Sequence, residues 1–122
     1  MKVEVSVGEV VDKWTILSIK FLNITDKDKL ANILKEKNYL NDAVHPEILH
    51  DPLTDELLNV NKHLWKVEDD LRDHERASVF NDVFIQKARS VYKLNDERAR
   101  IKKEINIKYG SEFVEEKSYQ PY

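Results

Sequence analysis

The sequence has no cysteine, and only two glycines and three prolines occur among its 122 residues. The absence of cysteine excludes disulfides, thiol nucleophiles and cysteine-based zinc sites. Because glycine and proline are so scarce, the chain lacks the turn residues that an all-β fold requires. With Gly8 and Gly110 as its only glycines, it also lacks a glycine-rich phosphate-binding loop.

Long apolar runs are also missing, since none approaches the roughly 20 residues that a membrane-spanning helix requires. Residues 1–14 lack the continuous apolar core of a signal peptide. The formal net charge is -3, and lysines and arginines are interleaved with acids along the chain, whereas nucleic-acid-binding proteins usually carry a basic stripe. We therefore expect a cytoplasmic protein that binds neither membranes nor nucleic acids.

What the sequence does contain favours long amphipathic helices. Charged residues make up 35% of the chain, more than the about 25% of typical domains, and apolar residues recur at helical spacing. The pattern predicts a single all-α domain over residues 1–122, an antiparallel up-down four-helix bundle with short irregular or strand-like terminal segments. The expected helices span residues 6–22, 26–44, 54–76 and 81–109, followed by a tail over residues 110–122.

Capping signals locate the ends of these helices. Ser6 and Glu9 form a capping box at the start of the first helix. Thr25 supplies a hydroxyl cap for the second helix, with acids in the turn that follows. Gly110 is typical of a residue that ends a helix, and it sets the end of the fourth.

The first expected helix is apolar on more than one side. One apolar stripe runs from Val7 to Phe21 at helical spacing, and Ile16 and Ile19 lie well away from it. The helix therefore either occupies the centre of the bundle or carries an oligomer interface. We predict a homodimer with Ile16 and Ile19 as interface residues.

The tail is unusually rich in aromatic residues for a chain terminus, because disordered tails usually lack them. We expect the tail to dock on its own bundle or on that of a neighbouring copy. Tyr119 and Tyr122 are its candidate interface residues.

Polar residues lie within or beside the apolar stripes of the third and fourth expected helices. Such a charge requires a partner, because removing one member of a buried ion pair costs about 3–5 kcal/mol. Six of these residues are candidates for binding a ligand: Glu68, Arg72, Glu75, Asn95, Arg98 and Lys102. We predict two polar layers, one of Lys13, Asn61, Asn95 and Arg98, and one of Lys20, Glu68, Arg72 and Glu75.

The layers admit three interpretations. Buried polar groups can fix which helices face each other, and this is the interpretation that we favour. A polar cavity could instead bind a small anion or a metal-phosphate group, with Glu68 and Glu75 as bases or metal ligands and Arg72, Arg98 and Lys102 holding the anion. The third interpretation is a polar oligomer interface.

Asp70 and His74 lie four residues apart, a spacing at which a carboxylate and an imidazole could share a metal cation. No second helix offers a matching motif, however. Di-iron bundles use Glu-x-x-His, and neither His63 nor His74 has an acid three residues before it. We therefore expect no metal and no cofactor, and keep Asp70 and His74 only as weak metal candidates.

Taken as a set, four segments of the chain resemble a bacterial family of small helical proteins that is classed as a domain of unknown function. The resemblance covers nearly the whole chain and implies a recurring unit of this length, but it brings no catalytic residues with it. The segments are VSVGEVVDKWTIL (5–17), LWKVEDDLRDHE (64–75), VYKLNDERARIKKEIN (91–106) and EEKSYQPY (115–122).

These observations favour a non-enzymatic protein-interaction or scaffold module that forms homo-oligomers, with room for a further protein partner. The alternative is a domain that binds a nucleotide or sugar phosphate, or a metal-dependent hydrolase, through the polar residues of the third and fourth helices. The residues alone leave open whether the protein is an enzyme.

Overall fold

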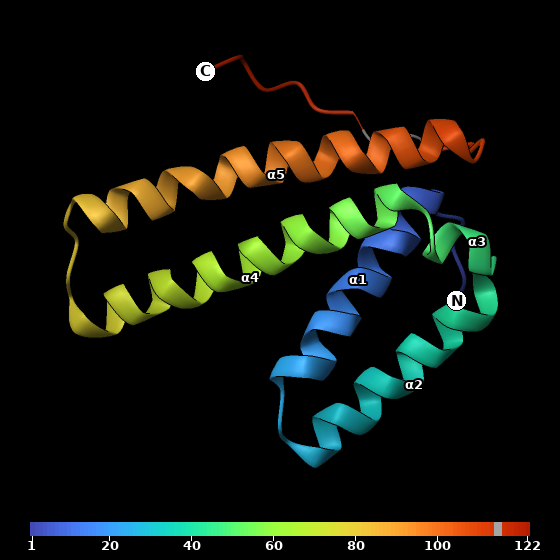
Figure 1. The fold of residues 1–122 in the computed structure, drawn as a ribbon, viewed down its shortest axis with the longest axis horizontal. Helices are drawn as coiled ribbons and strands as arrows, with labels where there is room; N and C mark the ends of the chain where they lie inside the picture. Colours follow the sequence, from blue (N-terminus) through green and yellow to red (C-terminus); the bar gives the residue numbers. More distant parts are fainter. Residues whose placement is uncertain (114–115) are drawn as a thin grey trace.

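The computed structural model describes residues 1–113 and 116–122, and within them it contains helices but no strand (Figure 1). The all-α expectation is confirmed, because four main helices pack against one another. Both termini are irregular where they are described, while residues 114–115 of the expected tail lie outside the described residues. The helices are α1 (Val7–Asn23), α2 (Lys27–Ala43), a single-turn α3 (Pro46–Leu49), α4 (Pro52–Ala77) and α5 (Asp82–Lys108).

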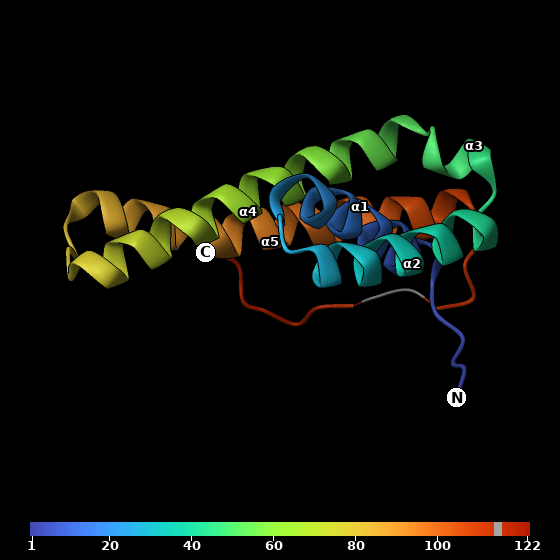
Figure 2. The same ribbon diagram turned by 90° about the horizontal axis from the view of Figure 1, so that it is seen from below.

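The main helices form two antiparallel hairpins, a long one of α4 and α5 and a shorter one of α1 and α2 (Figure 1). Helix α1 is central, since it packs on α2, α4 and α5, whereas α2 packs chiefly on α1. Both views show the long hairpin extending beyond α1 and α2 towards the α4–α5 turn (Figures 1 and 2). The fold therefore has three packed helices at one end of the hairpin and only two at the other.

The helix starts follow from side-chain caps. Ser6 caps α1 by accepting a hydrogen bond from the Glu9 amide, as the capping box predicts. The prediction for the second helix was wrong by one residue: Asp26, not Thr25, is the cap, because its carboxylate accepts from the Lys29 amide at 2.9 Å. Each cap satisfies a backbone N–H that has no partner inside the helix.

Helix α4 starts at Pro52, earlier than residue 54, because Asp51 caps it and proline is well suited to the first turn. The two ends of the long hairpin also have clear causes. Ser78 has a left-handed conformation (φ 54°) that ends α4, and Gly110 (φ 65°) follows the end of α5.

Two apolar clusters share α1. The larger joins α1 to the long hairpin and the smaller joins α1 to α2, so α1 is held on two sides. Full burial of one such side chain contributes about 1.5–3 kcal/mol. The buried members are Val11, Leu57, Ile101 and Ile105 in the first cluster, and Leu17, Ile33 and Leu40 in the second.

Burial decreases along the long hairpin towards its turn. Leu57 is 0% exposed and Leu64 is 9% exposed, while Leu71, two turns further on, is only partly buried. At the turn itself, Val79 and Phe80 are 41% and 53% exposed. The core thus ends where α1 leaves the hairpin.

Candidate functional site

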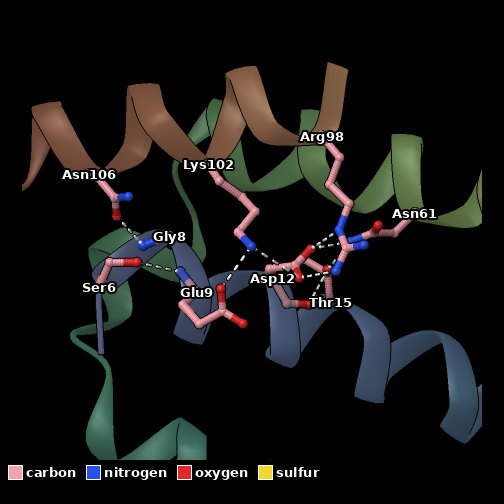
Figure 3. Close-up of polar contacts among 9 residues, drawn as sticks. All are labelled: Ser6, Gly8, Glu9, Asp12, Thr15, Asn61, Arg98, Lys102 and Asn106. Atoms are coloured by element: carbon pink, nitrogen blue, oxygen red, sulfur yellow. Dashed lines mark hydrogen bonds and ion pairs between the residues drawn. The ribbon is translucent and has the colours of Figure 1, made fainter. Parts of the chain in front are cut away.

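The first turn of α1 is bonded to its own cap residue, Ser6, and to the end of α5 and the residues just after it. All four backbone amides of this turn donate to protein oxygens, so the α1 N-terminus does not offer the free amides that bind an anion at a helix start. Figure 3 shows two of these bonds, those of Gly8 and Glu9. The acceptors are Ser111 Oγ for Val7 (2.7 Å), Asn106 Oδ1 for Gly8 (2.6 Å), Ser6 Oγ for Glu9 (3.1 Å) and the Ser6 carbonyl for Val10 (3.2 Å).

Gly8 is required by this close approach. A Cβ atom at position 8 would lie 2.5 Å from the Lys102 carbonyl oxygen and 2.8 Å from Asn106 Oδ1. Both distances are far shorter than a van der Waals contact between heavy atoms. Gly8 therefore sets how closely α1 can lie on α5, and with it the register of the polar contacts further along both helices.

Asp12 is the centre of a buried polar cluster that joins three helices (Figure 3). The residue is 2% exposed, and its carboxylate accepts two bonds from Arg98, one of them from Nε at 2.9 Å. Asn61 Nδ2 donates to Asp12 Oδ1 at 2.9 Å and to Thr15 Oγ1 at 2.8 Å. Because Asp12 is on α1, Asn61 on α4 and Arg98 on α5, the cluster fixes the relative positions of all three.

Lys102 extends the cluster towards the start of α1. Its ammonium group, on a side chain that is only 7% exposed, donates to Glu9 at 2.8 Å and lies 3.8 Å from Asp12. Among the described residues, the cluster pairs the bases Lys102 and Arg98 with the acids Glu9 and Asp12. Bases that are already paired with acids attract an anionic ligand less strongly.

The first predicted polar layer is partly confirmed, because Asn61 and Arg98 do meet. It was wrong for Lys13, which bonds to Glu36 of α2 at 2.6 Å on the surface. Adjacent helix residues point about 100° apart, so when Asp12 faces the hairpin, Lys13 faces α2. Asn95 lines a groove beside the cluster instead of joining it.

Asp12, around which this cluster is built, was not among the predicted site residues. A signal was present, since Gly8, Asp12 and Thr15 are spaced four and three residues apart and therefore share one helix face. A glycine, an acid and a hydroxyl on one face of an otherwise apolar helix indicate a close, polar contact with a neighbour.

The second predicted layer is largely absent. Arg72 bonds to Glu68 at 3.0 Å, one turn away on the same helix, and both side chains are well exposed. Such pairs contribute about 0.3–0.5 kcal/mol. No hydrogen bond or ion pair joins Lys20 to either residue in the described part of the chain, and Glu75 is exposed.

A groove of about 530 Å³ lies between α1, α4 and α5, where α1 leaves the hairpin. We call it the α1–α4–α5 groove. Its lining includes four of the six ligand-binding candidates, both isoleucine interface candidates and one indole ring: Glu68, Arg72, Asn95, Arg98, Ile16, Ile19 and Trp65. Ile19 is 3% exposed and so has little surface left for a partner. Lys102 and Glu75 lie outside the groove lining.

The lining of the groove holds two acids, Glu68 and Asp69, and two bases, Arg72 and Arg98. Because Arg98 is already paired with Asp12, the groove carries no surplus of positive charge. Its volume is within the about 300–1,000 Å³ typical of ligand pockets. Its charge balance suits a neutral or mixed-charge surface better than a concentrated anion.

The weak metal candidates have other partners. Asp70 accepts a hydrogen bond from Lys87 at 3.1 Å, and this bond lowers the pKa of the Asp70 carboxyl. His74 Nδ1 lies 2.9 Å from the Val79 carbonyl oxygen. Among residues 1–113 and 116–122, no group of three or more potential metal-ligating side chains could hold an ion.

A second buried acid ties the start of α4 to the end of α5. Asp51 caps α4 and also accepts bonds from Tyr109 and, at 2.5 Å, from Lys108. The Lys108 bond is the main cause that lowers the pKa of Asp51 to about 2, and the bond to Asp51 raises the pKa of Tyr109 to about 12. The sequence signal for this cap is the Asp-Pro pair at residues 51–52, with the proline as the first residue of α4.

The described part of the tail lies along α5 of its own chain (Figure 2). The ring of Tyr122 packs edge-on against Tyr92, with 5.4 Å between the ring centroids, and Glu116 bonds to Lys103 at 3.0 Å. Tyr119 is 77% exposed. The described tail residues thus contact helices of their own chain, and docking on a neighbouring copy stays a prediction.

None of the described helices is both long and apolar enough to cross a membrane. The chain matches no curated protein and no solved structure. Over residues 1–122 it does match a family model, which confirms the resemblance seen in its sequence. The chain belongs to this family, described as a family of unknown function (DUF6165).

Proposed function

We propose that the chain is a non-enzymatic protein-interaction module that self-associates through one face of the α4–α5 hairpin. We call this surface the bare face, because α1 covers its continuation at the other end of the hairpin. The bare face consists of Glu68, Leu71, Arg72 and Glu75 of α4, and Phe84, Ala88, Val91 and Asn95 of α5.

On α5, the bare face continues the row of residues that contacts α1. Lys102 and Asn106 bond to the first turns of α1. Phe84 and Ala88 precede them by 18 residues each, which is about five full turns at 3.6 residues per turn. These two apolar side chains therefore point in the same direction as two residues that α1 covers.

On α4, the same relation holds for the charged members of the face. Asn61 bonds to Asp12 and Thr15 of α1. Glu68 and Arg72 follow Asn61 by 7 and 11 residues, about two and three turns. The same side of the hairpin is therefore buried under α1 in one half and uncovered in the other.

The observation that carries the proposal is the incomplete burial of this face. In the covered half, the seam residues Leu57 and Ile105 are 0% exposed. In the bare half, Leu71, Phe84 and Val91 are only partly buried. Helical bundles bury such stripes by adding further helices, and a second hairpin would complete a bundle of four.

The contacts that the charged side chains make within the chain support a binding role for the protein rather than a catalytic one. Asp12, Arg98 and Lys102 join helices to each other. In the α1–α4–α5 groove beside them, Glu68 and Arg72 bond to each other. The charged groups that the sequence suggested for ligand chemistry are therefore engaged with partners inside the chain.

The test is sedimentation velocity over protein concentrations from about 1 μM to about 1 mM, the range in which weak dimers dissociate. We expect the wild-type chain to shift from monomer to dimer with increasing concentration. Val91→Glu places a charge on the bare face and should remain monomeric. Ile107→Glu is the matched control, because Ile107 is on the same helix, 68% exposed and outside the face.

Circular dichroism must show that both variants remain helical. A wild-type chain that is monomeric over the whole range, or a Val91→Glu variant that dimerises like the wild type, would contradict the proposal.

A second candidate function is small-molecule binding in the α1–α4–α5 groove, favoured by the meeting of Glu68, Arg72, Asn95 and Arg98 in its lining. A thermal-shift screen with nucleotides, sugar nucleotides and divalent cations tests it, since a ligand that binds only the folded state raises its stability. The charge balance of the groove leads us to expect no shift with phosphorylated ligands. A shift that disappears in Arg72→Ala would favour this candidate.

A further inference from the structure

We infer that the partner at the bare face is a second copy of this chain in antiparallel orientation, with the hairpin tip of each copy seated in the α1–α4–α5 groove of the other. The tip comprises residues 76–84, around the α4–α5 turn. The inference rests on the proposed function and specifies its partner and geometry.

The two ends of the bare face differ, since one is a groove with apolar side chains in its walls and the other is an exposed apolar tip. At one end is the groove, whose walls include Ile16, Leu64 and Trp65. At the other end is the tip, with Val79 and Phe80 exposed by 41% and 53%. Antiparallel copies place each tip over the groove of the other copy, whereas parallel copies place tip against tip and leave both grooves empty.

The charges on the face favour the same orientation. Glu68 and Arg72 lie one turn apart on α4. A two-fold axis that lies between the copies, perpendicular to α4 and level with residue 70, brings Glu68 of each copy opposite Arg72 of the other. Parallel copies in register would place Glu68 opposite Glu68 and Arg72 opposite Arg72, and such like-charge contacts across an interface are unfavourable.

The same two-fold axis, level with residue 70, also determines where the tip of one copy lies on the other copy. Residues 64 and 76 lie six positions on either side of residue 70, a displacement of about 9 Å at 1.5 Å per residue. The axis therefore places residue 76 of one copy opposite Leu64 of the other, at the groove wall. Two independent features, the charge pattern and the apolar ends, lead to one register.

The size of the face sets the expected strength of the dimer. From residue 64 to residue 77 the hairpin extends about 20 Å, and two packed helices are about 20 Å across, which gives a footprint of about 400 Å². Standard interfaces bury about 800 Å² per partner. We therefore expect a dimer that dissociates on dilution.

Cross-linking tests the orientation, and the absence of native cysteine makes every introduced thiol unique. Ala77→Cys places a thiol at the tip, and Leu22→Cys places one on a residue that is 74% exposed and lines a neighbouring pocket together with Trp65 of the groove wall. Each variant is treated with a short bismaleimide alone and in a mixture with the other, at a concentration where sedimentation detects the dimer.

We expect a cross-linked dimer in the mixture and little in either variant alone, because the two-fold axis separates like positions. The two Ala77 positions would be about 21 Å apart along the hairpin, seven residues on each side of the axis. Cross-linking of Ala77→Cys to itself, or a dimer without cross-linking in the mixture, would overturn the antiparallel inference and leave the proposed function standing. A chain that is monomeric by sedimentation would overturn both.

Charge reversal tests the register independently. Arg72→Glu should weaken dimerisation by about tenfold or more, equivalent to about 1.4 kcal/mol, because each new glutamate faces Glu68 of the other copy. The double variant Glu68→Arg with Arg72→Glu should restore the wild-type dissociation constant. An unchanged constant in Arg72→Glu, or no recovery in the double variant, would overturn this register.

Discussion

The two halves of the α4–α5 hairpin carry similar residues, but the fold uses them differently. In the half that α1 covers, Arg98 and Lys102 meet Asp12 in a buried cluster. In the bare half, the one partner of Arg72 among the described residues is Glu68 of its own helix, and these side chains are 64% and 45% exposed. A charged side chain beside an apolar stripe is therefore buried in a contact between helices only where a third helix packs against it.

The largest effect should come from removing the centre of the covered half. Asp12→Ala takes away the carboxylate that Arg98 and Asn61 bond to, and disrupting such a buried pair costs about 3–5 kcal/mol. The free energy of unfolding in urea measures this loss. Asp73→Ala is the control, since Asp73 is 69% exposed in the bare half. Equal losses of unfolding free energy in the two variants would show that the covered and bare halves do not differ in this way.

Separating α1 from α5 should have the next largest effect. Gly8→Ala introduces a methyl group 2.5 Å from the Lys102 carbonyl oxygen, and such overpacking costs roughly 1–3 kcal/mol. Because α1 would have to move away, hydrogen exchange should also accelerate at the amides of Arg98 and Lys102 but not in the bare half. Uniform acceleration along the hairpin would indicate that the contact has no local role.

Acid should weaken the covered half through Asp51. Because the folded-state pKa of Asp51 is about 2, below its usual 3.8, its contribution is complete above pH 3.8 and is lost as the pH falls through about 2. Asp51→Asn removes a charged hydrogen-bond acceptor and should cost roughly 1–3 kcal/mol at pH 7. The difference in unfolding free energy between the two proteins should shrink as the pH falls towards 2, and a constant difference would contradict the assignment.

The smallest effect should come from the bare half of the monomer. Glu68→Ala removes an exposed pair with Arg72, worth about 0.3–0.5 kcal/mol. Unfolding should be measured at a concentration where sedimentation detects only monomer, so that dimer contacts do not contribute. A loss near that of Asp12→Ala would show that Glu68 has a buried role, contrary to the comparison of the halves.

Part of the site could be anticipated from residue patterns. The helical wheel placed Arg98 and Lys102 in an apolar arc, where each needs a partner, and both have one. The same reasoning assigned Lys13 to the cluster in place of Asp12. A one-residue error on a helix is a 100° error in direction, and the angle of α1 on the hairpin cannot be read from its own sequence.

The second layer failed for a different reason. Glu68, Arg72 and Lys20 would have met if α1 ran parallel to α4 along its whole length. Instead α1 crosses the hairpin at an angle and leaves it (Figure 1). Helix crossing angles depend on how side-chain ridges fit into grooves of the neighbour, which is a property of two surfaces together.

The sequence by itself determined the all-α class, the capped start of α1 at Ser6 and the presence of charges that need partners, because caps and periodicity act within one helix. Only the tertiary structure decided which charges are buried, since that depends on where a third helix lies. Asp12 and Glu68 are both acids on amphipathic helices, and the position of α1 alone makes one a buried link and the other a surface pair.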